Sequence, residues 1–179
     1  MIETDRLIIR DFTFDDLETV HSLVQDPDIY KYQHWGPNSY EDTKNYIKMC
    51  IDQQSETPRK SFELCITDKA TGDFIGAIGI RIKSTSSKNA DLGYWVRKDK
   101  WGNGIGTEAT RGIIKFGFND LKMNRIWATV SPENISSIRV LEKSGMKKEG
   151  LMRQDMFVRG EYRDSVLMAI ILEDFRGSK

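Results

Sequence analysis

The sequence of 179 residues has few side chains of the kinds that bind metals. Its two cysteines, Cys50 and Cys65, lie far apart without CxxC spacing, and its only histidines are His21 and His34. Structural zinc sites need cysteines or histidines in closely spaced pairs, so this pattern predicts no metal site. We expect each cysteine to be a small residue of the core.

The sequence also lacks an excess of either charge and any long apolar run. Lys and Arg together number 27, as do Asp and Glu, so no general attraction to nucleic acid or to an anionic membrane is expected. No stretch approaches the ~20 apolar residues of a membrane span, and residues 1–6 do not begin a secretion signal. We therefore expect a cytoplasmic protein that binds neither nucleic acid nor membranes.

A glycine-rich segment, Trp-Gly-Asn-Gly-Ile-Gly-Thr-Glu-Ala at residues 101–109, carries the strongest functional signal. It follows a strand-like stretch at residues 91–97 and opens a helical pattern, which aims several backbone N–H groups at an anion. The ligand should therefore carry phosphate. The glycines do not give the G-x-G-x-x-G fingerprint, and no lysine follows as in a P-loop, so both common nucleotide sites are disfavoured.

The glycine-rich segment resembles the acyl-CoA loop of the GNAT acetyltransferases, whose pattern is Gln/Arg-x-x-Gly-x-Gly/Ala. Gly104 and Gly106 match it, and Trp101 stands where Gln or Arg is usual, as is typical of the RimJ/RimL-like branch. Three more segments resemble the family: Thr-Asp-Arg-Leu-Ile-Ile-Arg at 4–10, Ser-Pro-Glu-Asn-Ile-Ser-Ser-Ile-Arg-Val-Leu-Glu-Lys-Ser-Gly-Met at 131–146 and Gly-Glu-Tyr-Arg-Asp at 160–164. The resemblance covers nearly the whole chain.

The length and the hydrophobic pattern predict one α/β domain over residues 1–179. Helices are expected after the caps Thr13-x-x-Asp16 and Ser39-x-x-Asp42, from residue 107 onward and at 136–144. Strands are expected at residues 7–10, 62–66, 74–82, 89–96, 125–130, 152–158 and 165–172. The order predicts a mixed sheet with a right-handed parallel crossover between 89–96 and 125–130. The resemblance implies the GNAT-like (acyl-CoA N-acyltransferase) fold: a mostly antiparallel central sheet flanked by helices, with these two strands splayed at the CoA site.

The resemblance further implies acetyl-CoA as co-substrate. Its pyrophosphate would lie on the glycine loop, where a Cβ would block it, and its pantetheine arm would lie between the splayed strands. The alternative is that the glycines only form a tight turn. Asn134, after Pro132, is equally a helix cap. The residues expected to bind acetyl-CoA are Tyr94, Trp95, Val96, Trp101, Gly102, Asn103, Gly104, Ile105, Gly106, Thr107 and Asn134.

Acetyl transfer to an amine needs a neutral nitrogen, donors for the oxyanion and a proton source for the departing thiolate. Many GNAT enzymes supply that proton from a Tyr, whose position here is Leu141, and RimL-like relatives point to Ser137 as the replacement. Asp91 lies where relatives carry Glu or Asp and is the expected base, directly or through water. Some RimL-like proteins carry a Glu at Met156, and the adjacent Asp155 should face the opposite side of its strand. The plainer alternatives are that Ser137 is a helix-surface residue and Asp91 a solvated carboxylate.

Two other groups are expected near an acceptor site or in the core. His21 should be structural, whereas His34, beside Trp35, is a candidate to line an acceptor cleft. The aromatic residues Tyr30, Tyr32, Trp35 and Tyr40 are expected to serve core or lid packing rather than as a binding platform.

The leading hypothesis is an acetyl-CoA-dependent N-acetyltransferase acting on a primary amine in a ternary complex. The resemblance does not fix the acceptor, since the branch includes enzymes acting on a protein N-terminus, a polyamine, an amino acid or an antibiotic. The alternative is a non-catalytic acyl-CoA-binding sensor, motivated by Leu141 and Met156. A NAD-binding module is disfavoured by the glycine spacing. The oligomeric state, monomer or homodimer, stays open.

Overall fold

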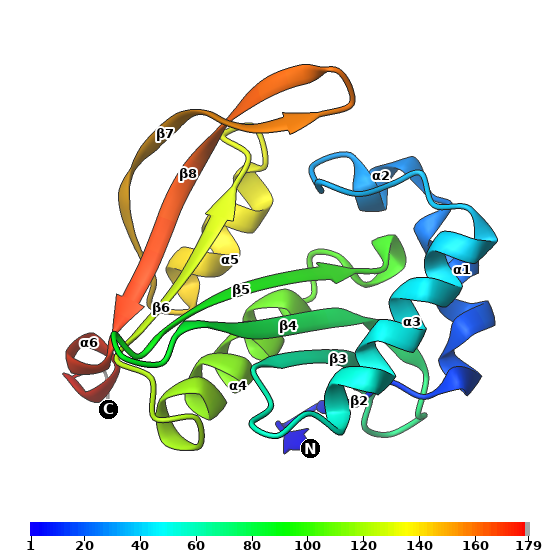
Figure 1. Cartoon of the computed structure of the whole chain (residues 1–179), viewed down its shortest axis with the longest axis horizontal. Helices are drawn as coiled ribbons and strands as arrows, with labels where there is room; N and C mark the ends of the chain where they lie inside the picture. The colour runs from blue at the N-terminus through cyan, green and yellow to red at the C-terminus, as the bar shows by residue number, and fades with distance from the viewer. Residues whose placement is uncertain (178–179) are drawn as a thin grey trace.

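The computed structural model describes residues 1–177, which form one eight-stranded sheet with helices on both faces (Figure 1). The strands lie in the order β1-β2-β3-β4-β5-β6-β8-β7, and each neighbouring pair is antiparallel except β5 and β6. The predicted mixed, mostly antiparallel sheet is confirmed. The strand bounds are β1 Ile2–Glu3, β2 Leu7–Asp11, β3 Ser61–Asp68, β4 Phe74–Ser84, β5 Asn89–Val96, β6 Arg125–Val130, β7 Lys147–Val158 and β8 Glu161–Ile171.

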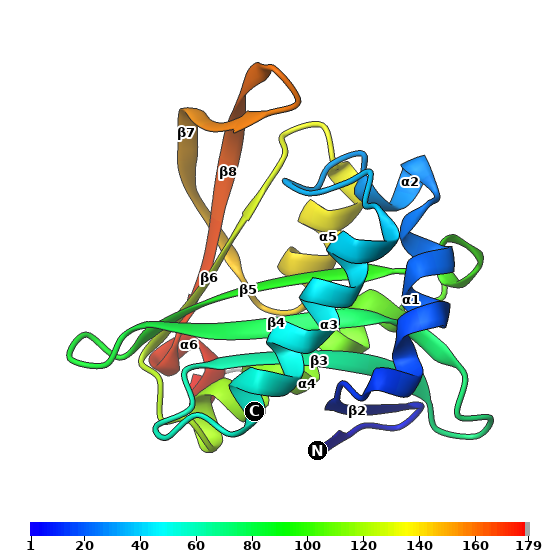
Figure 2. The same cartoon turned by 45° about the vertical axis from the view of Figure 1, so that its right-hand side comes forward.

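The longer helices divide between the two faces of the sheet. Helices α1 (Leu17–Val24) and α3 (Tyr40–Gln54) cover one face, whereas α4 (Ile105–Asn119) and α5 (Ile135–Lys143) lie on the other (Figures 1 and 2). The short elements are α2 Pro27–Tyr30, α6 Leu172–Gly177 and the 3-10 turns η1 Phe14–Asp16 and η2 Lys98–Lys100.

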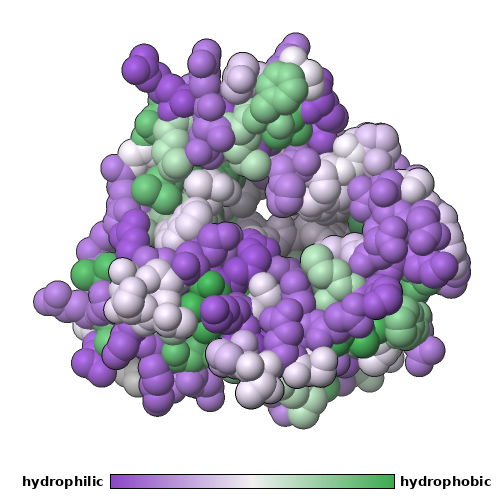
Figure 3. Space-filling model, in the orientation of Figure 1, coloured by the Kyte–Doolittle hydropathy of each residue, from purple (hydrophilic) through white to green (hydrophobic). Residues whose placement is uncertain are grey.

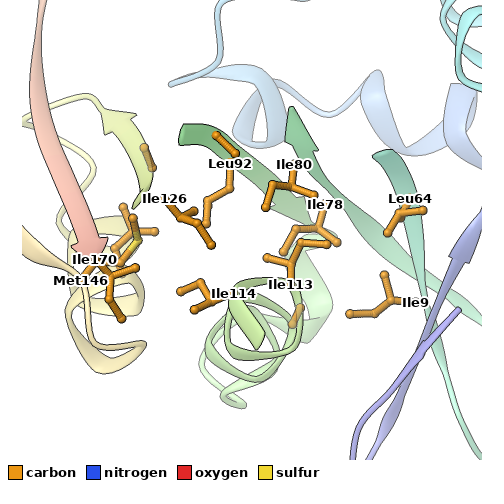
Figure 4. Packing of buried hydrophobic residues seen from close by; sticks show 14 of the residues in the cluster. Ile9, Leu64, Ile78, Ile80, Leu92, Ile113, Ile114, Ile126, Met146 and Ile170 are labelled. Atoms are coloured by element: carbon orange, nitrogen blue, oxygen red, sulfur yellow. The ribbon is translucent and has the colours of Figure 1, made fainter. Parts of the chain in front are cut away.

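Alternating residues of the same strands build a core on each face. On the α4 face, Ile113 and Ile114 pack against Ile80 and Leu92 of the sheet (Figure 4). Burying each such side chain stabilises the fold by about 1.5–3 kcal/mol. The other core lies under α1 and α3 and includes both cysteines, which are free and buried as expected.

Close packing explains a glycine inside α4. A Cβ on Gly117 would lie 2.6 Å from Cδ1 of Ile126 and 2.8 Å from Cδ1 of Ile80. A larger residue would therefore push the helix off the sheet. The helix approaches the sheet closely here, as the glycines in its sequence suggested.

The β5–β6 pair is short, and this positions the functional site. Only three residue pairs join the two strands, Asn89–Arg125, Ala90–Ile126 and Asp91–Trp127. Beyond them β5 stays with β4 to Val96, and β6 stays with β8 to Val130, so the two strands diverge (Figure 1). The predicted splay is confirmed.

Local signals specified several boundaries. The Ser39 N–H donates to the Asp42 carboxylate at 2.9 Å, and the Thr13 N–H donates to Asp16 at 2.9 Å, so both predicted caps form. The Thr13 cap begins the 3-10 turn before α1 rather than α1 itself. Arg159 and Gly160 have φ of 51° and 88°, as a two-residue hairpin turn requires. The sequence did not predict β1, α2 or α6, which are too short to show a periodic pattern.

Candidate active site

The glycine loop is held at both of its ends. Trp101 donates its indole N–H to the Val96 carbonyl at 2.6 Å, which ties the loop to the end of β5. Arg6 donates to the Asn103 carbonyl at 3.0 Å and forms an ion pair with Glu108 of α4 at 2.7 Å. These contacts fix the loop before any ligand arrives, which lowers the ordering cost of binding.

The first turn of α4 presents free N–H groups beside this loop. Gly104 is the N-cap with φ of 78°, and the first helical hydrogen bond runs from the Glu108 N–H to its carbonyl at 3.0 Å. The N–H groups of Ile105, Gly106 and Thr107 come before that bond, so they lack acceptors within the helix. Together with the helix dipole they favour an anion such as phosphate.

The two glycines that match the loop pattern serve different needs. Gly104 occupies the left-handed region, which disfavours any residue with a Cβ. Gly106 has ordinary helical backbone, but a Cβ there would lie 3.3 Å from Cε2 of Tyr94 and 3.5 Å from Val140. The motif alone suggested phosphate clearance for both. The structure gives each glycine a further reason: Gly104 is required by its left-handed backbone, and Gly106 leaves room for the Tyr94 ring.

Tyr94 and Val96 turn their main-chain groups toward the splay. The Arg97 N–H donates to the Ile75 carbonyl at 2.8 Å. Because hydrogen-bonded residues alternate along an antiparallel pair, the main-chain N–H and carbonyl of Trp95 also point toward β4. The carbonyl of Tyr94 accepts instead from Gln33 Nε2 at 3.4 Å, and that of Val96 accepts from Trp101. The main-chain groups of all three residues were expected to meet the pantetheine arm. Those of Trp95 instead point away from the splay.

A pair of hydroxyl groups lies on the α4 and α5 side of the splay. The Tyr94 phenol donates to the Ser137 Oγ at 3.1 Å. Burial raises the pKa of Tyr94 to about 12, so the phenol keeps its proton at neutral pH. Ser137 is half-buried, which differs from the plain helix-surface alternative. Since its oxygen accepts from Tyr94, its own proton is left to donate elsewhere.

Two other residues of this helix have defined structural roles. The Asn134 side chain accepts from the Ser137 N–H at 3.1 Å and caps α5, so its capping role is present. Leu141, at the position where many GNAT enzymes carry Tyr, is 1% exposed within the core. That position therefore offers no proton donor.

A cavity of about 730 Å³ lies on the opposite face of the sheet. It reaches the splay, since Gly93 and Tyr94 of β5 and Trp127 and Thr129 of β6 are among its lining residues. The surface is hollowed between the β7–β8 hairpin and helices α1 to α3 (Figure 3). The glycine loop, whose free N–H groups favour an anion, thus follows one of two diverging strands that both line this cavity.

Asp91 faces this cavity within an ion-pair network. Its carboxylate accepts from Arg81 Nε at 3.1 Å and from Arg81 Nη2 at 2.9 Å, and Glu63 accepts from Arg81 Nη1 at 2.9 Å. Asp91 is therefore not the simple solvated carboxylate of the plainer alternative. Tyr94 lies three positions after Asp91 along β5, and this odd offset places the two side chains on opposite faces.

The connector at residues 31–38 forms one wall of the cavity. His34 and Trp35 line it, and Trp35 also packs edge-to-face on Trp95 with ring centroids 6.3 Å apart. His21 instead contacts Thr43 Oγ1 at 3.1 Å and lies against Tyr40, which fits the structural role expected for it.

Several groups of the cavity were not picked out from the sequence. Glu63 of β3 lies opposite Gly79, and Arg81 of β4 lies opposite Asp91. Arg163 of β8 contacts the Met156 Sδ at 3.3 Å. Strand alternation puts Met156 toward the cavity and leaves Asp155 exposed, as predicted. A search for oppositely charged residues in register across β4 and β5 would have found Arg81.

Within residues 1–177, no group of three or more His, Cys, Asp or Glu side chains is placed to hold a metal ion. No helix in the same part of the chain is both long and apolar enough to cross a membrane.

Residues 6–147 match the family model of the acetyltransferase (GNAT) domain. The chain belongs to the GNAT acetyltransferase family. As a GNAT protein it is an N-acetyltransferase, as the motifs predicted. A GNAT acetyltransferase structure from Bacillus anthracis is 31% identical to it with a TM-score of 0.84, over 96% of this chain and 98% of that one.

Two further relatives bear on the branch and on the fold. The Bacillus subtilis protein YdaF, a putative ribosomal N-acetyltransferase, is 31% identical over 60% of this GNAT chain and 59% of its own, in agreement with the RimJ/RimL-like branch. A spermidine N-acetyltransferase structure from Vibrio cholerae, in complex with CoA and spermine, is 19% identical with a TM-score of 0.82, over 97% of this chain and 99% of that one. At that identity the likeness shows the fold alone.

Proposed function

We propose that residues 1–179 act as a single catalytic domain that transfers the acetyl group of acetyl-CoA to a primary amine by direct attack in a ternary complex. One observation carries the proposal: the cavity reaches the same splay that the glycine loop and Ser137 border from the other face. A thioester in the splay would meet an amine arriving from the cavity. Holding two reactants in contact supplies a large share of the rate enhancement of such enzymes.

The residues present fit acetyl-CoA along its length. The N–H groups of Ile105, Gly106 and Thr107 suit the pyrophosphate, and Trp101, Gly102, Asn103 and Gly104 hold the turn that aims them. The main-chain groups of Tyr94 and Val96 suit the amides of the pantetheine arm, which would extend the sheet like a strand. Gln33 and Trp101 hold the two carbonyls in the structure, so the arm would compete with the Gln33 contact at Tyr94. Asn134 would contribute through its Nδ2 amide, since its Oδ1 caps α5.

The Tyr94–Ser137 pair supports a role for Ser137 as proton donor. The amine attacks the carbonyl carbon, and collapse of the tetrahedral intermediate breaks the C–S bond and leaves the electron pair on sulfur. Ser137 gives its proton to that thiolate and is reprotonated from solvent, while the Tyr94 phenol holds the hydroxyl in orientation. Leu141 cannot take this part because it carries no ionisable group.

Asp91 is the second residue that we propose for catalysis, as a base that acts directly or through water. Its carboxylate faces the amine side of the splay. Arg81 bonds to both of its oxygens, so a proton taken by Asp91 would weaken that ion pair. The variant Asp91→Asn keeps the shape and removes the charge, and a fall in kcat without a change in acetyl-CoA affinity would support this role.

The amine acceptor is either a protein α-amine or a small-molecule amine. The likeness to YdaF supports a ribosomal protein as the acceptor, and the likeness in fold to the Vibrio cholerae enzyme, which binds spermine, supports a polyamine. A cavity of about 730 Å³ has room for either a small amine or the first residues of a peptide.

The test is calorimetric titration with acetyl-CoA, with NADH as control, followed by measurement of released CoA thiol across peptides, polyamines, amino acids and aminoglycosides. Binding of acetyl-CoA alone and turnover with one acceptor class support the proposal. Binding without turnover on any amine would favour the acyl-CoA sensor, and absence of acetyl-CoA binding would contradict both.

A further inference from the structure

We propose that His34 is the catalytic base that accepts the proton of the attacking amine. This inference rests on the proposed function, because it assigns a role at the same splay. It is an alternative to Asp91 as the base: His34 lines the same cavity but belongs to the connector rather than to the sheet.

The connector that carries His34 is fastened to the β7–β8 hairpin. Arg159, at the hairpin turn, donates to five carbonyls at 2.8–3.4 Å, and Arg163 of β8 donates to the Tyr32 carbonyl at 2.7 Å. The Arg159 acceptors are the carbonyls of Tyr30, Lys31, Gln33, Trp35 and Gly36. Bonds to both neighbours of His34 and to the residue two before it fix the backbone of this histidine at the cavity wall. A positioned base must be held in this way to act within hydrogen-bond reach of its substrate.

The carboxylates of the cavity are already occupied. Asp91 and Glu63 both accept from Arg81, and Asp42 accepts from the Ser39 N–H and hydroxyl at 2.9 and 2.6 Å in the cap of α3. The His34 ring, in contrast, forms no hydrogen bond with any residue of the described chain, 1–177. Among the cavity groups able to take a proton near neutral pH, His34 is therefore the one that would break no existing bond by doing so.

Burial and the charges of four strands together lower the pKa of His34, which favours the neutral imidazole at pH 7. Burial lowers the pKa of His34 below 6.5, and Arg81 of β4 and Arg163 of β8 lower it further. Glu63 of β3 and Asp91 of β5 act in the opposite direction with smaller effect. A base must be unprotonated, so the active form is present above the pKa and is lost as the pH falls through values below 6.5.

The proton balance of the reaction then closes across the sheet. The amine nitrogen forms the C–N bond, and the carbonyl electron pair moves to oxygen. The N–H proton passes to a His34 ring nitrogen. The oxygen electron pair then re-forms the C=O bond as the C–S bond breaks, and the thiolate takes the Ser137 proton on the other face. Afterwards His34 releases its proton to solvent as Ser137 regains one, so each turnover yields the acetylated amine and CoA thiol.

The experiment compares His34→Gln with the matched variant His21→Gln, which alters the only other histidine of the sequence and lies outside the cavity lining. For each, kcat is measured from pH 5 to 9 at saturating amine and acetyl-CoA. We expect His34→Gln to lower kcat at pH 7.5 by about 100-fold and to lose the acidic limb of the profile, with acetyl-CoA affinity intact. His21→Gln should keep both the rate and the limb.

The outcomes separate this inference from the function on which it rests. Turnover by the parent with an unchanged rate and an unchanged acidic limb in His34→Gln would overturn the His34 assignment alone, whereas a parent without turnover on any amine would overturn both. Should His34→Gln fold poorly, His34→Ala with added imidazole gives the same answer: rescue of kcat by imidazole supports the base, and an unrescued, pH-independent loss contradicts it.

Discussion

The two faces of the splay differ in the chemistry that they offer. On the α5 face, two hydroxyl groups, Tyr94 and Ser137, share a hydrogen bond among mainly apolar neighbours. On the α3 face, carboxylates, guanidinium groups and a neutral imidazole surround an open cavity. In the mechanism that we propose, the proton donor Ser137 therefore lies on one side of the sheet and the proton acceptor on the other.

The largest expected effect removes the donor from the α5 face. Ser137→Ala should lower kcat by about 100-fold, because the thiolate then leaves without a positioned proton. Acetyl-CoA affinity, measured by calorimetry, should stay the same. The neighbouring exposed serine gives the control, since Ser136→Ala changes the same atoms one residue away. Equal rates for the two variants would remove Ser137 from the mechanism.

The next prediction acts only on the cavity face. Arg159→Met removes the guanidinium that holds five connector carbonyls, so the connector loses its attachment to the hairpin. We expect the KM for the amine to rise about tenfold, which is the effect on binding expected from the loss of a few exposed, charge-assisted hydrogen bonds.

Steady-state kinetics with each substrate varied in turn would measure this effect. The KM for acetyl-CoA should be unchanged, and Arg153→Met, at an exposed arginine of β7, should alter neither constant. A rise in both KM values would mean that the connector serves both faces rather than one.

A double-mutant cycle sharpens the description of the α5 face. Tyr94→Phe removes the hydrogen bond to Ser137 and should lower kcat about fivefold, as expected for one net hydrogen bond of about 1 kcal/mol. Because Tyr94 acts through Ser137, the same change should have no effect on kcat when Ser137 is already Ala. A full additional loss in the Ser137→Ala background would show that Tyr94 contributes to kcat by another route.

The smallest expected effect concerns the glycine loop. Gly104 and Gly72 both have positive φ, 78° and 79°, and neither would meet a close clash with an added Cβ. Replacing either by Ala should therefore cost about 1 kcal/mol of folding stability through backbone strain. Thermal unfolding measures that common cost. Only Gly104→Ala should also weaken acetyl-CoA binding, by a few fold, and similar affinities for the two variants would argue against the loop as the phosphate site.

Much of the fold was predictable because the sequence signals are local. The capping pairs Ser39–Asp42 and Thr13–Asp16 and the Arg159–Gly160 turn each act within four residues, so the chain specifies them before tertiary packing. The glycine loop and the Ser137 helix carried family motifs, which placed them in the correct order. In the structure the loop follows β5 and the Ser137 helix follows β6, the two strands that diverge.

The cavity could not be predicted in the same way, because it is built from long-range contacts. Arg159 meets connector carbonyls more than 120 residues earlier in the chain, and main-chain acceptors leave no trace in a sequence pattern. His34 was visible only as a candidate for a cleft wall. The direction of the Trp95 main-chain groups could not be predicted either, because it depends on the register of β4 with β5, and that register fixes the neighbours of each main-chain group.

The short β5–β6 ladder also matters for how this protein avoids unwanted association. A strand that loses its partner exposes an edge onto which other chains can add, and the splay creates such edges inside the molecule. Helix α5 lies behind the gap (Figure 1), and the Gln33 and Trp101 side chains already bond to two of the carbonyls there. The protein's own helix and side chains thus protect these edges from strand addition by another chain.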